Sequence, residues 1–375
     1  MSFQTDLRIF FTPEGQDVTE DIRDDILAFS YEDRDGDEAD EISLTLKDQT
    51  GKWAGRWRPD GGETVRATLG IKTLDGIAIG NALRCGTFYV DSMSASGSPR
   101  VFQLRAIAIP LRSNLRRRRV TKAWEDKTLK GIASEIAKSA GVELLFESED
   151  DPRYDRQDQK DESNLRFLAR LCSDAGKSVK VTDEMLVIFD QETYEKKPPV
   201  ATIALGVSDL RSWSFESQQS ETYKTCTVSW RDYRKKTPTS AGGYDIDVAK
   251  AKALADDGYD IDAVPKAKDN AAVMTYTYVD PDVDDNGQDL KLKKRAKTIE
   301  EAKRLAKAEL RKHNLRRLTG SLTLAGNPSI VAGVVIECKG FGAFDGNFLV
   351  ESASHSVTNS GYTTSIQVRA VNRKY

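Results

Sequence analysis

Two neighbouring strands with the same residue pattern occur once near the start of this chain and once near its end. The late copy begins at Gly346 and reads Gly-Asn-Phe-Leu-Val-Glu-Ser-Ala-Ser-His, and the early copy begins at Gly86 and reads Gly-Thr-Phe-Tyr-Val-Asp-Ser-Met-Ser-Ala. The returning strands also match, with Gln-Val-Arg-Ala ending at Ala370 and Gln-Leu-Arg-Ala ending at Ala106. Alternating apolar and polar residues are typical of strands with one buried face. The repeat predicts one β unit that is used twice.

Two further blocks precede each copy in the same order. Ser-Leu-Thr-Leu occurs at 43–46 and again at 321–324, and a strand that a proline introduces and a glycine ends occurs at 59–70 and again at 328–340. The alternative interpretation is convergence, since all amphipathic antiparallel strands alternate in the same way. The ordered set of three blocks favours duplication over convergence.

The repeat and the strands around it predict a mainly β fold with two related antiparallel β-barrels. Short strands with one buried face, separated by turns rich in Asp and Gly, imply a barrel or a sandwich. Phe88 and Val90, like Phe348 and Val350, are expected to face a barrel core, while the polar residues between them face a lumen or a neighbour. His355 lies in the same strand pair and is expected to be a structural histidine in the barrel wall.

Between the two β regions the hydrophobic period becomes helical. One helix is predicted to start at Asp126 or Thr128 and to stop at Gly141, and a second is predicted to be capped by Ser163 and to stop at Gly176. A strand at 142–146, a polar loop and a hairpin near 179–189 complete a small α+β unit. The apolar stripes of both helices are interpreted as core.

These patterns predict three domains, at residues 1–118, 119–197 and 198–375. The third carries a polar, irregular insertion at about 234–297, with a short helix near 248–255 and a strand near 275–279. Thr298-Ile-Glu-Glu is a capping box that opens a helix at about 298–313, expected to lie on a barrel or at a subunit contact. In the insertion Asp282-x-Asp-x-Asn-Gly resembles half of a calcium loop, but Lys293 stands where a bidentate Glu is needed, so a turn is predicted.

Two charged runs are candidate binding sites. Residues 33–41 are mostly acidic, and a solvated turn is favoured over a cation site because the order does not match a calcium loop. Arginines fill positions 116–119; guanidinium groups suit phosphate, but no aromatic residues are interleaved as single-strand binding requires. The arginine run is therefore interpreted as a connector or an ion-pair partner of acidic stretches.

The residues that usually carry catalysis are scarce or scattered. The four cysteines have no CxxC spacing and are expected to be small buried hydrophobes, and only His313 and His355 are present. No nucleophile elbow, phosphate loop, zinc motif or dinucleotide motif occurs. A pair of catalytic carboxylates would need a cleft and a raised pKa, whereas most acidic residues lie in exposed-looking loops. No catalytic residue, cofactor or metal site is predicted.

Charge and hydropathy restrict the remaining classes. The 56 basic and 59 acidic side chains nearly balance, unlike the basic surface of a nucleic-acid binder. No apolar run approaches the ~20 residues that span a bilayer, and the N-terminus lacks a signal-peptide core. The chain is expected to be made in a cytoplasm and to have no membrane span.

The ordered motifs resemble the late control protein D family, the tail hub proteins of contractile-tailed phages. The family is related in fold to the hub beneath the T-even phage spike and to the hub part of type VI secretion spike proteins. The resemblance covers nearly the whole chain in collinear order and is weakest over 234–297. It is carried by Asp37-Glu-Ala-Asp-Glu-Ile-Ser-Leu-Thr-Leu-Lys-Asp, Cys85-Gly-Thr-Phe-Tyr-Val-Asp, Trp124-Glu-Asp-Lys-Thr-Leu-Lys-Gly-Ile-Ala, Asp161-Glu-Ser-Asn-Leu-Arg-Phe-Leu-Ala-Arg-Leu, and Gly326-Asn-Pro through Gly340-Phe-Gly to Gly346-Asn-Phe-Leu-Val.

The resemblance implies a structural baseplate hub. Family hubs carry two related barrels per subunit, and three subunits form a pseudo-sixfold ring that joins a sixfold tail tube to a threefold spike. The implied partners are two further copies of the chain, the central spike, the tail tube and other baseplate proteins, with genome or cargo passing through the lumen. The implied location is the baseplate of a virion or phage-tail-like particle, assembled in the bacterial cytoplasm.

Two other functions remain open from the sequence. One is a cell-wall-acting protein of the tail tip, either a peptidoglycan hydrolase that uses loop carboxylates or a carbohydrate-binding module. The other is a DNA-contacting tail component that acts through Arg116 to Arg119.

Overall fold

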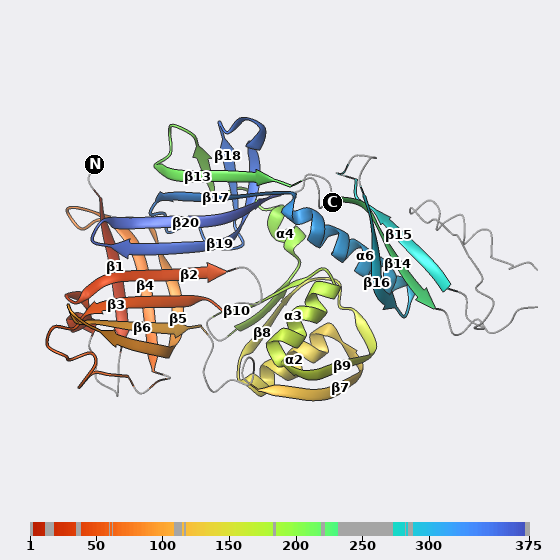
Figure 1. The fold of residues 1–375 in the computed structure, drawn as a ribbon, viewed down its shortest axis with the longest axis horizontal. Coiled ribbons are helices and arrows are strands. Elements are labelled where there is room, and N and C mark those ends of the chain that lie inside the picture. The colour runs from red at the N-terminus through yellow and green to blue at the C-terminus, as the bar shows by residue number, and fades with distance from the viewer. Residues whose placement is uncertain are drawn as a thin grey trace, which may run out of the picture. The chain divides into compact units, whose positions relative to one another are not determined.

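The computed structural model describes residues 3–11, 19–34, 39–59, 61, 63–108, 115, 118–182, 185–218, 222–231, 273–281, 283 and 288–371. The chain forms two compact units (Figure 1). The first contains Met1–Arg170, Ser178–Phe215 and Thr319–Val371, and the second contains Leu171–Lys177, Glu216–Leu318 and Asn372–Tyr375.

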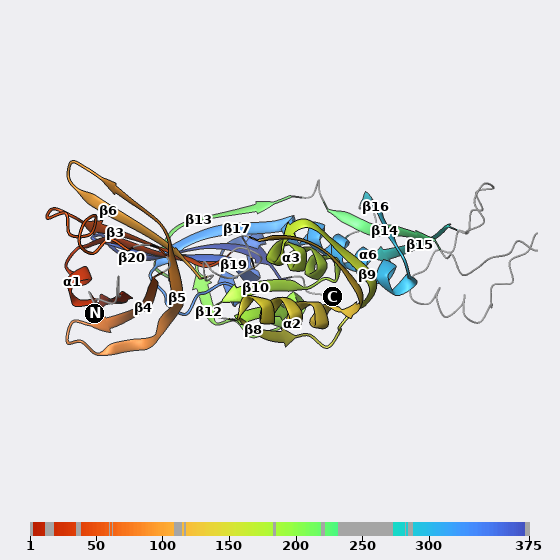
Figure 2. The same ribbon diagram turned by 90° about the horizontal axis from the view of Figure 1, so that it is seen from below.

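The first unit is built on a twelve-stranded sheet. Its main path has the order β1-β4-β5-β6-β3-β2-β19-β20-β17-β13, while β18 pairs with β19 and β12 pairs with β18. Figure 2 shows the long β5 between β4 and β6. The strands are β1 (Phe3–Phe11), β2 (Ile26–Arg34), β3 (Glu41–Lys47), β4 (Thr64–Thr73), β5 (Ala78–Ser96), β6 (Val101–Ile107), β12 (Ala201–Ala204), β13 (Leu210–Ser217), β17 (Leu318–Ala325), β18 (Val335–Lys339), β19 (Gly346–Thr358) and β20 (Gly361–Ala370). A short helix, α1 (Thr19–Arg23), precedes β2, and a short 3-10 helix, η3 (Gly342–Phe344), precedes β19, while a second, η2 (Leu315–Arg317), belongs to the second unit.

The predicted duplication is present as a four-strand unit that occurs twice. The first copy has the sheet order β4-β5-β6-β3 and the second has β18-β19-β20-β17, so the same chain order gives the same sheet order. The register of β5 against β6 shifts between Val90 and Ser92, and that of β19 against β20 shifts between Val350 and Ser352. A β-bulge at the same place in both copies is a feature that period-two burial alone does not require.

The bulges correct the sequence match of the returning strand. Ser92 lies opposite Arg105, and its counterpart Ser352 lies opposite Gln367, so Arg105 corresponds to Gln367 and not to Arg369. The Ser-Leu-Thr-Leu strands agree, because Ser43 lies opposite Arg105 and Ser321 lies opposite Gln367. A shift of two residues keeps every side chain on the same face of the sheet, which is why the sequence comparison could not detect it.

Alternation buries one face of each copy. In β3 the buried residues are Ile42, Leu44 and Leu46, and the residues between them remain partly exposed. Phe88, Val90, Phe348 and Val350 are each no more than 1 % exposed. These side chains lie in the interior of the first unit, as core residues of a duplicated sheet would.

The mainly β, antiparallel fold class is confirmed, but closed barrels are not established. The pairings among the described residues form one open path from β1 to β13, and β2 joins the two copies through β19 (Figure 1). The two barrels therefore stay a prediction. The strand β2, which makes the join, was missed because its sequence runs directly into the acidic stretch 33–41.

The α+β segment contains the expected helices. The first, α2 (Leu129–Ala140), is capped by Thr128, whose hydroxyl accepts a hydrogen bond from the N–H of Gly131, and it ends at Gly141 with φ +72°. The second, α3 (Asn164–Asp174), begins where the N–H of Arg166 donates to the hydroxyl of Ser163. A short helix, α4 (Gln191–Glu195), follows the hairpin of β10 (Ser178–Thr182) and β11 (Met185–Phe189), and β8 (Glu143–Glu147) pairs in parallel with β11.

One element of this segment corrects the prediction of a polar loop. Residues Arg153–Ser163 form β9, which pairs antiparallel with β7 (Arg119–Thr128). Both strands are rich in charged residues, so their sequence lacks the apolar alternation by which strands are recognised.

In the second unit a helix packs on a three-stranded sheet. The sheet contains β14 (Tyr223–Arg231), β15 (Val273–Val279) and β16 (Gln288–Ala296), with β14 in the centre. The helix is α6 (Ile299–Asn314), capped by the hydroxyl of Thr298, which accepts from the N–H of Glu301. Its buried Ala302, Leu305, Ala306 and Leu310 contact the sheet core. The helix thus covers the three-stranded sheet of its own unit, and the expected position on a barrel or at a subunit contact stays a prediction.

The predicted insertion includes two of those strands, so it is not wholly irregular. The strand near 275–279 is present within β15, whereas β16 was missed because lysines separate its leucines. The predicted helix near 248–255 and the turn at 282–287 lie outside the described residues, apart from Val283.

Gly326 offers a test of how closely the chain packs against Tyr362 of β20. A Cβ placed on Gly326 would lie 1.9 Å from Cδ1 of Tyr362, whereas one placed on Gly70 would have Ala82 Cβ as its nearest neighbour, at 3.4 Å. We expect Gly326→Ala to lower the free energy of unfolding by about 1–3 kcal/mol or more, because the tyrosine ring must move, and Gly70→Ala to change it by less than about 0.5 kcal/mol. Urea unfolding of both variants measures this; equal effects would show that Tyr362 does not pack on Gly326.

Candidate functional site

The two copies of the four-strand unit meet where β2 pairs antiparallel with the second half of β19. The pairs run from Ala28 opposite Thr358 to Arg34 opposite Ser352. The same edge of β19 pairs with β18 at residues 346–349, on the other side of the bulge. We call the β2–β19 pairing the internal joint, since it connects the copies within one chain.

Aromatic rings fill the buried face of the internal joint. Tyr31 lies opposite His355, with ring centroids 6.0 Å apart and planes 15° apart, and it meets Phe88 edge-on at 5.9 Å. His355 is fully buried, and its Nδ1 lies 2.7 Å from the hydroxyl of Tyr362. Burial lowers the pKa of His355 to about 4, so the ring is neutral near pH 7. These contacts give His355 a structural position in the sheet.

A buried carboxylate at the end of β2 connects three segments of the first unit. Asp33 is 4 % exposed, and its Oδ2 accepts a hydrogen bond of 2.9 Å from the N–H of Ala332, which lies between β17 and β18. Its Oδ1 accepts a hydrogen bond from Nζ of Lys180 in β10. Asp33 therefore links β2 to the α+β segment and to the second copy of the repeat.

A second buried carboxyl, Asp40, completes this cluster. Its Oδ1 lies 3.6 Å from Nζ of Lys180 and accepts from the N–H of Arg34 at 3.1 Å, and the hydroxyl of Tyr31 also bonds to it. Burial raises the pKa of Asp40 to about 7, with the negative charge of Asp33 adding to the rise and Lys180 opposing it. We call Asp33, Asp40 and Lys180 the buried ionic cluster.

The buried ionic cluster corrects the interpretation of residues 33–41 as a solvated turn. Asp33 belongs to β2, and both Asp33 and Asp40 are buried, while residues 35–38 lie outside the described part of the chain. No sequence signal distinguishes these two carboxylates from their exposed neighbours, because their cationic partner is remote in sequence.

A buried arginine makes a second such connection. Arg369 of β20 is 1 % exposed and lies 2.6 Å from Oε1 of Glu195 in α4. Its Nε lies 3.4 Å from Oε1 of Glu351, the residue of the bulge in β19. The bulge thus turns an acidic side chain toward the arginine of the neighbouring strand.

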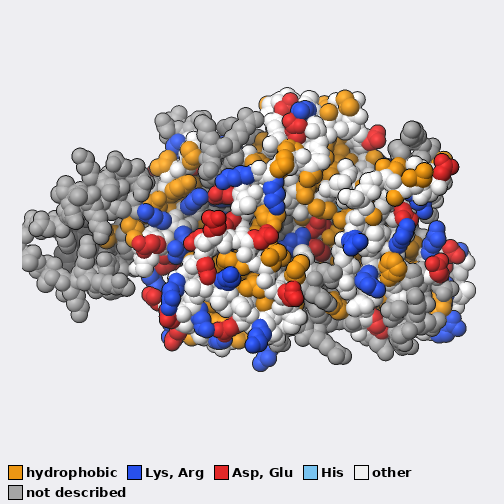
Figure 3. Space-filling model, turned by 180° about the vertical axis from the view of Figure 1, so that it is seen from behind, with side chains coloured by type: hydrophobic (Ala, Val, Ile, Leu, Met, Phe, Trp, Pro, Cys, Tyr) orange, Lys and Arg blue, Asp and Glu red, His pale blue; other side chains and the backbone are white. Residues whose placement is uncertain are grey.

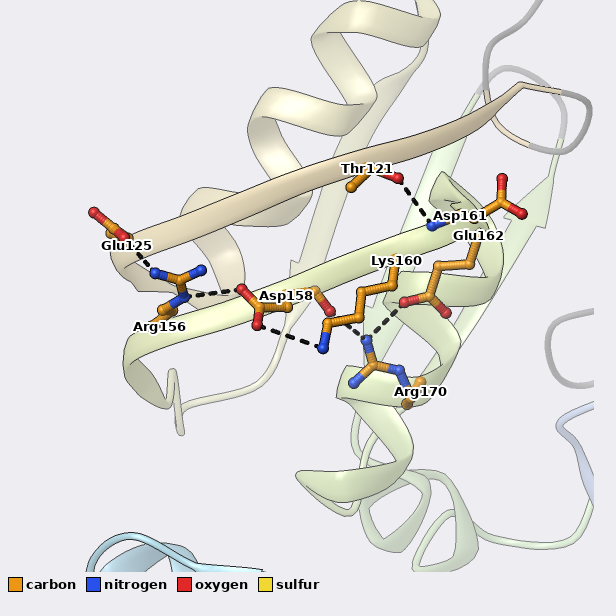
Figure 4. Close-up of polar contacts among 8 residues, drawn as sticks. All are labelled: Thr121, Glu125, Arg156, Asp158, Lys160, Asp161, Glu162 and Arg170. Atoms are coloured by element: carbon orange, nitrogen blue, oxygen red, sulfur yellow. Dashed lines mark hydrogen bonds and ion pairs between the residues drawn. The ribbon is translucent and has the colours of Figure 1, made fainter.

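Exposed ion pairs cover the β7–β9 ribbon (Figure 4). Arg156 donates to Glu125 across the strands and to Asp158 along its own strand, and Arg170 of α3 donates to Glu162 at 2.7 Å. From the arginine run, Arg119 pairs with Asp161 at 3.1 Å, whereas Arg116 and Arg117 lie outside the described residues. On the face drawn in Figure 3, acidic and basic side chains are interspersed. This ribbon has the mixed charge of a solvated surface.

The described residues offer little for catalysis or metal binding. Among them no group of three or more His, Cys, Asp or Glu side chains could hold a metal ion. All four cysteines are buried, as predicted, and burial raises the pKa of Cys85 to about 12, so its thiol stays protonated. Within the described ranges no helix is long and apolar enough to cross a membrane.

The structure buries all four of the residues expected to face a barrel core, and it reveals further buried residues that the sequence did not indicate. Phe88 and Val90 lie in the hydrophobic core of the first copy, and Phe348 and Val350 are buried in the second. Lys180 was not a candidate, and Asp33 and Asp40 were considered only as part of the acidic stretch 33–41, for which a solvated turn was favoured over a cation site.

Comparisons with known proteins agree on one family. The profile of the family described as phage tail baseplate hub (GPD) matches residues 67–361. A probable baseplate hub protein of Escherichia phage P2 is 25% identical over 384 residues, covering 95% of this chain and 91% of the phage protein.

Solved structures share the fold. The 43 kDa tail protein of prophage MuSo2 from Shewanella oneidensis matches with a TM-score of 0.65 and 15% identity, covering 97% of this chain and 98% of the tail protein. A component of the E. coli type VI secretion system, described as structurally similar to T4 bacteriophage tail proteins, matches with a TM-score of 0.52 and 12% identity, covering 94% of this chain and 75% of that protein.

The buried ionic cluster predicts a large difference between two identical substitutions. Lys180→Met should lower the free energy of unfolding by about 3–5 kcal/mol, because it leaves buried carboxylates without a cation. The control is Lys127→Met, which removes an exposed 2.6 Å pair with Glu135 and should cost less than about 1 kcal/mol. Asp33→Asn should recover part of the loss when combined with Lys180→Met. Denaturant unfolding checks this; similar losses for both lysines would contradict the role of the cluster.

Proposed function

This chain belongs to the phage tail baseplate hub (GPD) family, and from that membership we propose that three copies of it form the ring at the centre of a baseplate. The chain is a baseplate hub protein. In the proposed ring each chain supplies both copies of its four-strand unit, so that three chains present six similar units. The observation that supports this proposal is the duplication with a shared register and a shared bulge.

Symmetry is the physical reason for such a duplication. A ring of three identical chains has threefold symmetry, and it approximates sixfold symmetry only if each chain presents two similar surfaces. A hub of this kind meets a sixfold tail tube on one side and a threefold spike on the other. We propose the tail tube, the central spike and other baseplate proteins as its partners, in a phage or another contractile injection particle assembled in the bacterial cytoplasm, with genome or cargo passing through the ring.

A trimer is the first expected result. Native mass spectrometry of the full chain, alone and co-expressed with the spike protein of the same particle, should give a species at three times the 41.7 kDa of one chain. Only monomers or dimers in both preparations would contradict the proposal.

We infer further that the hub is structural and not a cell-wall hydrolase. A glycosidase needs a carboxylic acid with a raised pKa beside an open cleft. Asp40 has the raised pKa, but it is 5 % exposed and contacts Lys180 and Tyr31, so no polysaccharide reaches it.

The purified protein is therefore expected to release no soluble muropeptides from peptidoglycan. Chromatography of sacculi incubated with the full chain measures this, with a lysozyme digest as the positive control. Release that copurifies with the chain and is unchanged in Asp40→Asn would show an enzyme that uses another site.

A further inference from the structure

The internal joint pairs β2 with β19, and each of these two strands has a structurally equivalent strand elsewhere in the same chain. β19 corresponds to β5 through the shared bulge. β2 corresponds to β13, because β2 pairs with β3 and β13 pairs with β17 at the same position of the repeated unit. Ser30 lies opposite Ser43, and the hydroxyls of Ser214 and Ser321 lie 3.0 Å apart.

Packing supports the same correspondence between β2 and β13. Tyr31 of β2 contacts Phe88 at 5.9 Å, and Phe215 of β13 contacts Phe348 at 5.2 Å between ring centroids. Phe88 and Phe348 are matched residues of the two copies. Ser214 and Phe215 therefore occupy the positions that Ser30 and Tyr31 occupy in the first copy.

The two equivalent strands, β13 and β5, do not pair with each other within the described part of one chain. Among the described residues, β13 pairs with β17 alone, and β5 beyond the bulge pairs with β6 alone. On β19, residues 352–356 alternate between partly exposed and buried, whereas on β5 all of residues 92–96 except Met93 are exposed. On β13, Trp213 is 44% exposed, while its counterpart Phe29 is 1% exposed. Each chain thus has both strands of a second joint, β13 and residues 92–96 of β5, but they are not paired with each other.

We propose that β13 of one chain pairs antiparallel with residues 92–96 of β5 in a second chain, and we call this pairing between chains the external joint. The internal joint fixes its register. Ser356 lies opposite Ser30 and Ser354 lies opposite Glu32, so Ser96 lies opposite Ser214 and Ser94 lies opposite Glu216. A serine faces a serine, and a serine faces a glutamate, in both joints.

The external joint uses β13 of one chain and β5 of the next, which are different surfaces. It is therefore a head-to-tail contact that repeats from chain to chain until a ring closes. Sheet edges supply the affinity, because each strand offers unpaired N–H and C=O groups along that edge. This inference rests on the proposed ring and specifies the strands and the register by which one subunit meets the next.

Paired cysteines test the register. The variant carrying Ser94→Cys and Glu216→Cys should form covalent trimers on mild oxidation that a thiol reductant reverses, while each single variant should not. Both positions are exposed and all four native cysteines are buried, so folding and background are little affected. The matched control carries Ser94→Cys and Ser217→Cys, since Ser217 points to the opposite face of β13 and should not cross-link.

A charge exchange provides an independent measurement. Ser94→Glu places like charges opposite each other and should weaken association by up to about fivefold per joint, whereas Ser94→Lys should strengthen it. Glu216→Lys should restore the association of Ser94→Glu. Native mass spectrometry over a range of concentrations gives the affinities.

The outcomes separate this inference from the proposed function. Trimers that form normally but fail to cross-link through Ser94 and Glu216, and that ignore the charge exchange, would overturn the external joint and leave the trimer intact. A chain that stays monomeric in every variant, with and without the spike, would overturn the trimer and the external joint together.

Discussion

The carboxylate of Asp33 is removed from water, and such a charge is tolerated only where a cation and N–H donors surround it. Its donors come from Lys180 and Ala332, which are remote from Asp33 and from each other in sequence. The charge is therefore satisfied only after β2, the α+β segment and the second copy of the repeat have come together. The internal joint holds Asp33 opposite Ala353 of the second copy, so the pairing of β2 with β19 and the two hydrogen bonds of Asp33 depend on the same arrangement of the first unit.

The sequence predicted what period-two burial encodes and little of what long-range contacts decide. Phe88 and Phe348 could be matched because an apolar residue recurs at the same place in both strand pairs. The return strand was matched two residues out of register, since Arg105 and Arg369 share a face and only the bulges reveal that they are not equivalent. The face of the sheet that a side chain occupies follows from the alternation along its own strand, whereas its register depends on the strand with which it pairs.

Besides β2, the strands that sequence reasoning missed are rich in charged residues. β9 pairs antiparallel with β7 and carries exposed ion pairs such as that between Arg153 and Asp126, and its residues show no apolar alternation. β16 hides Leu290 and Leu292 among lysines. Helices α2 and α6 were predicted, because Thr128 and Thr298 mark their first turns as caps that depend only on the next three residues, whereas the short α1 and α4 were not.

The equivalent strands β2 and β13 differ in composition, because β2 pairs within its own chain and β13 has a free edge in the described part of the chain. β2 meets its partner within one chain and never needs to be soluble alone, so it can present Phe29 and Tyr31 as buried residues. In the proposed ring, β13 is exposed until a second chain pairs with it, and an exposed apolar edge can pair with any other strand. It has Arg211 and Glu216 on its exposed positions, and serines at 212, 214 and 217, which keep the edge hydrated. In the proposed ring, a strand of this composition binds weakly in a single joint and gains affinity when all joints form together, so pairing at β13 depends on completion of the ring.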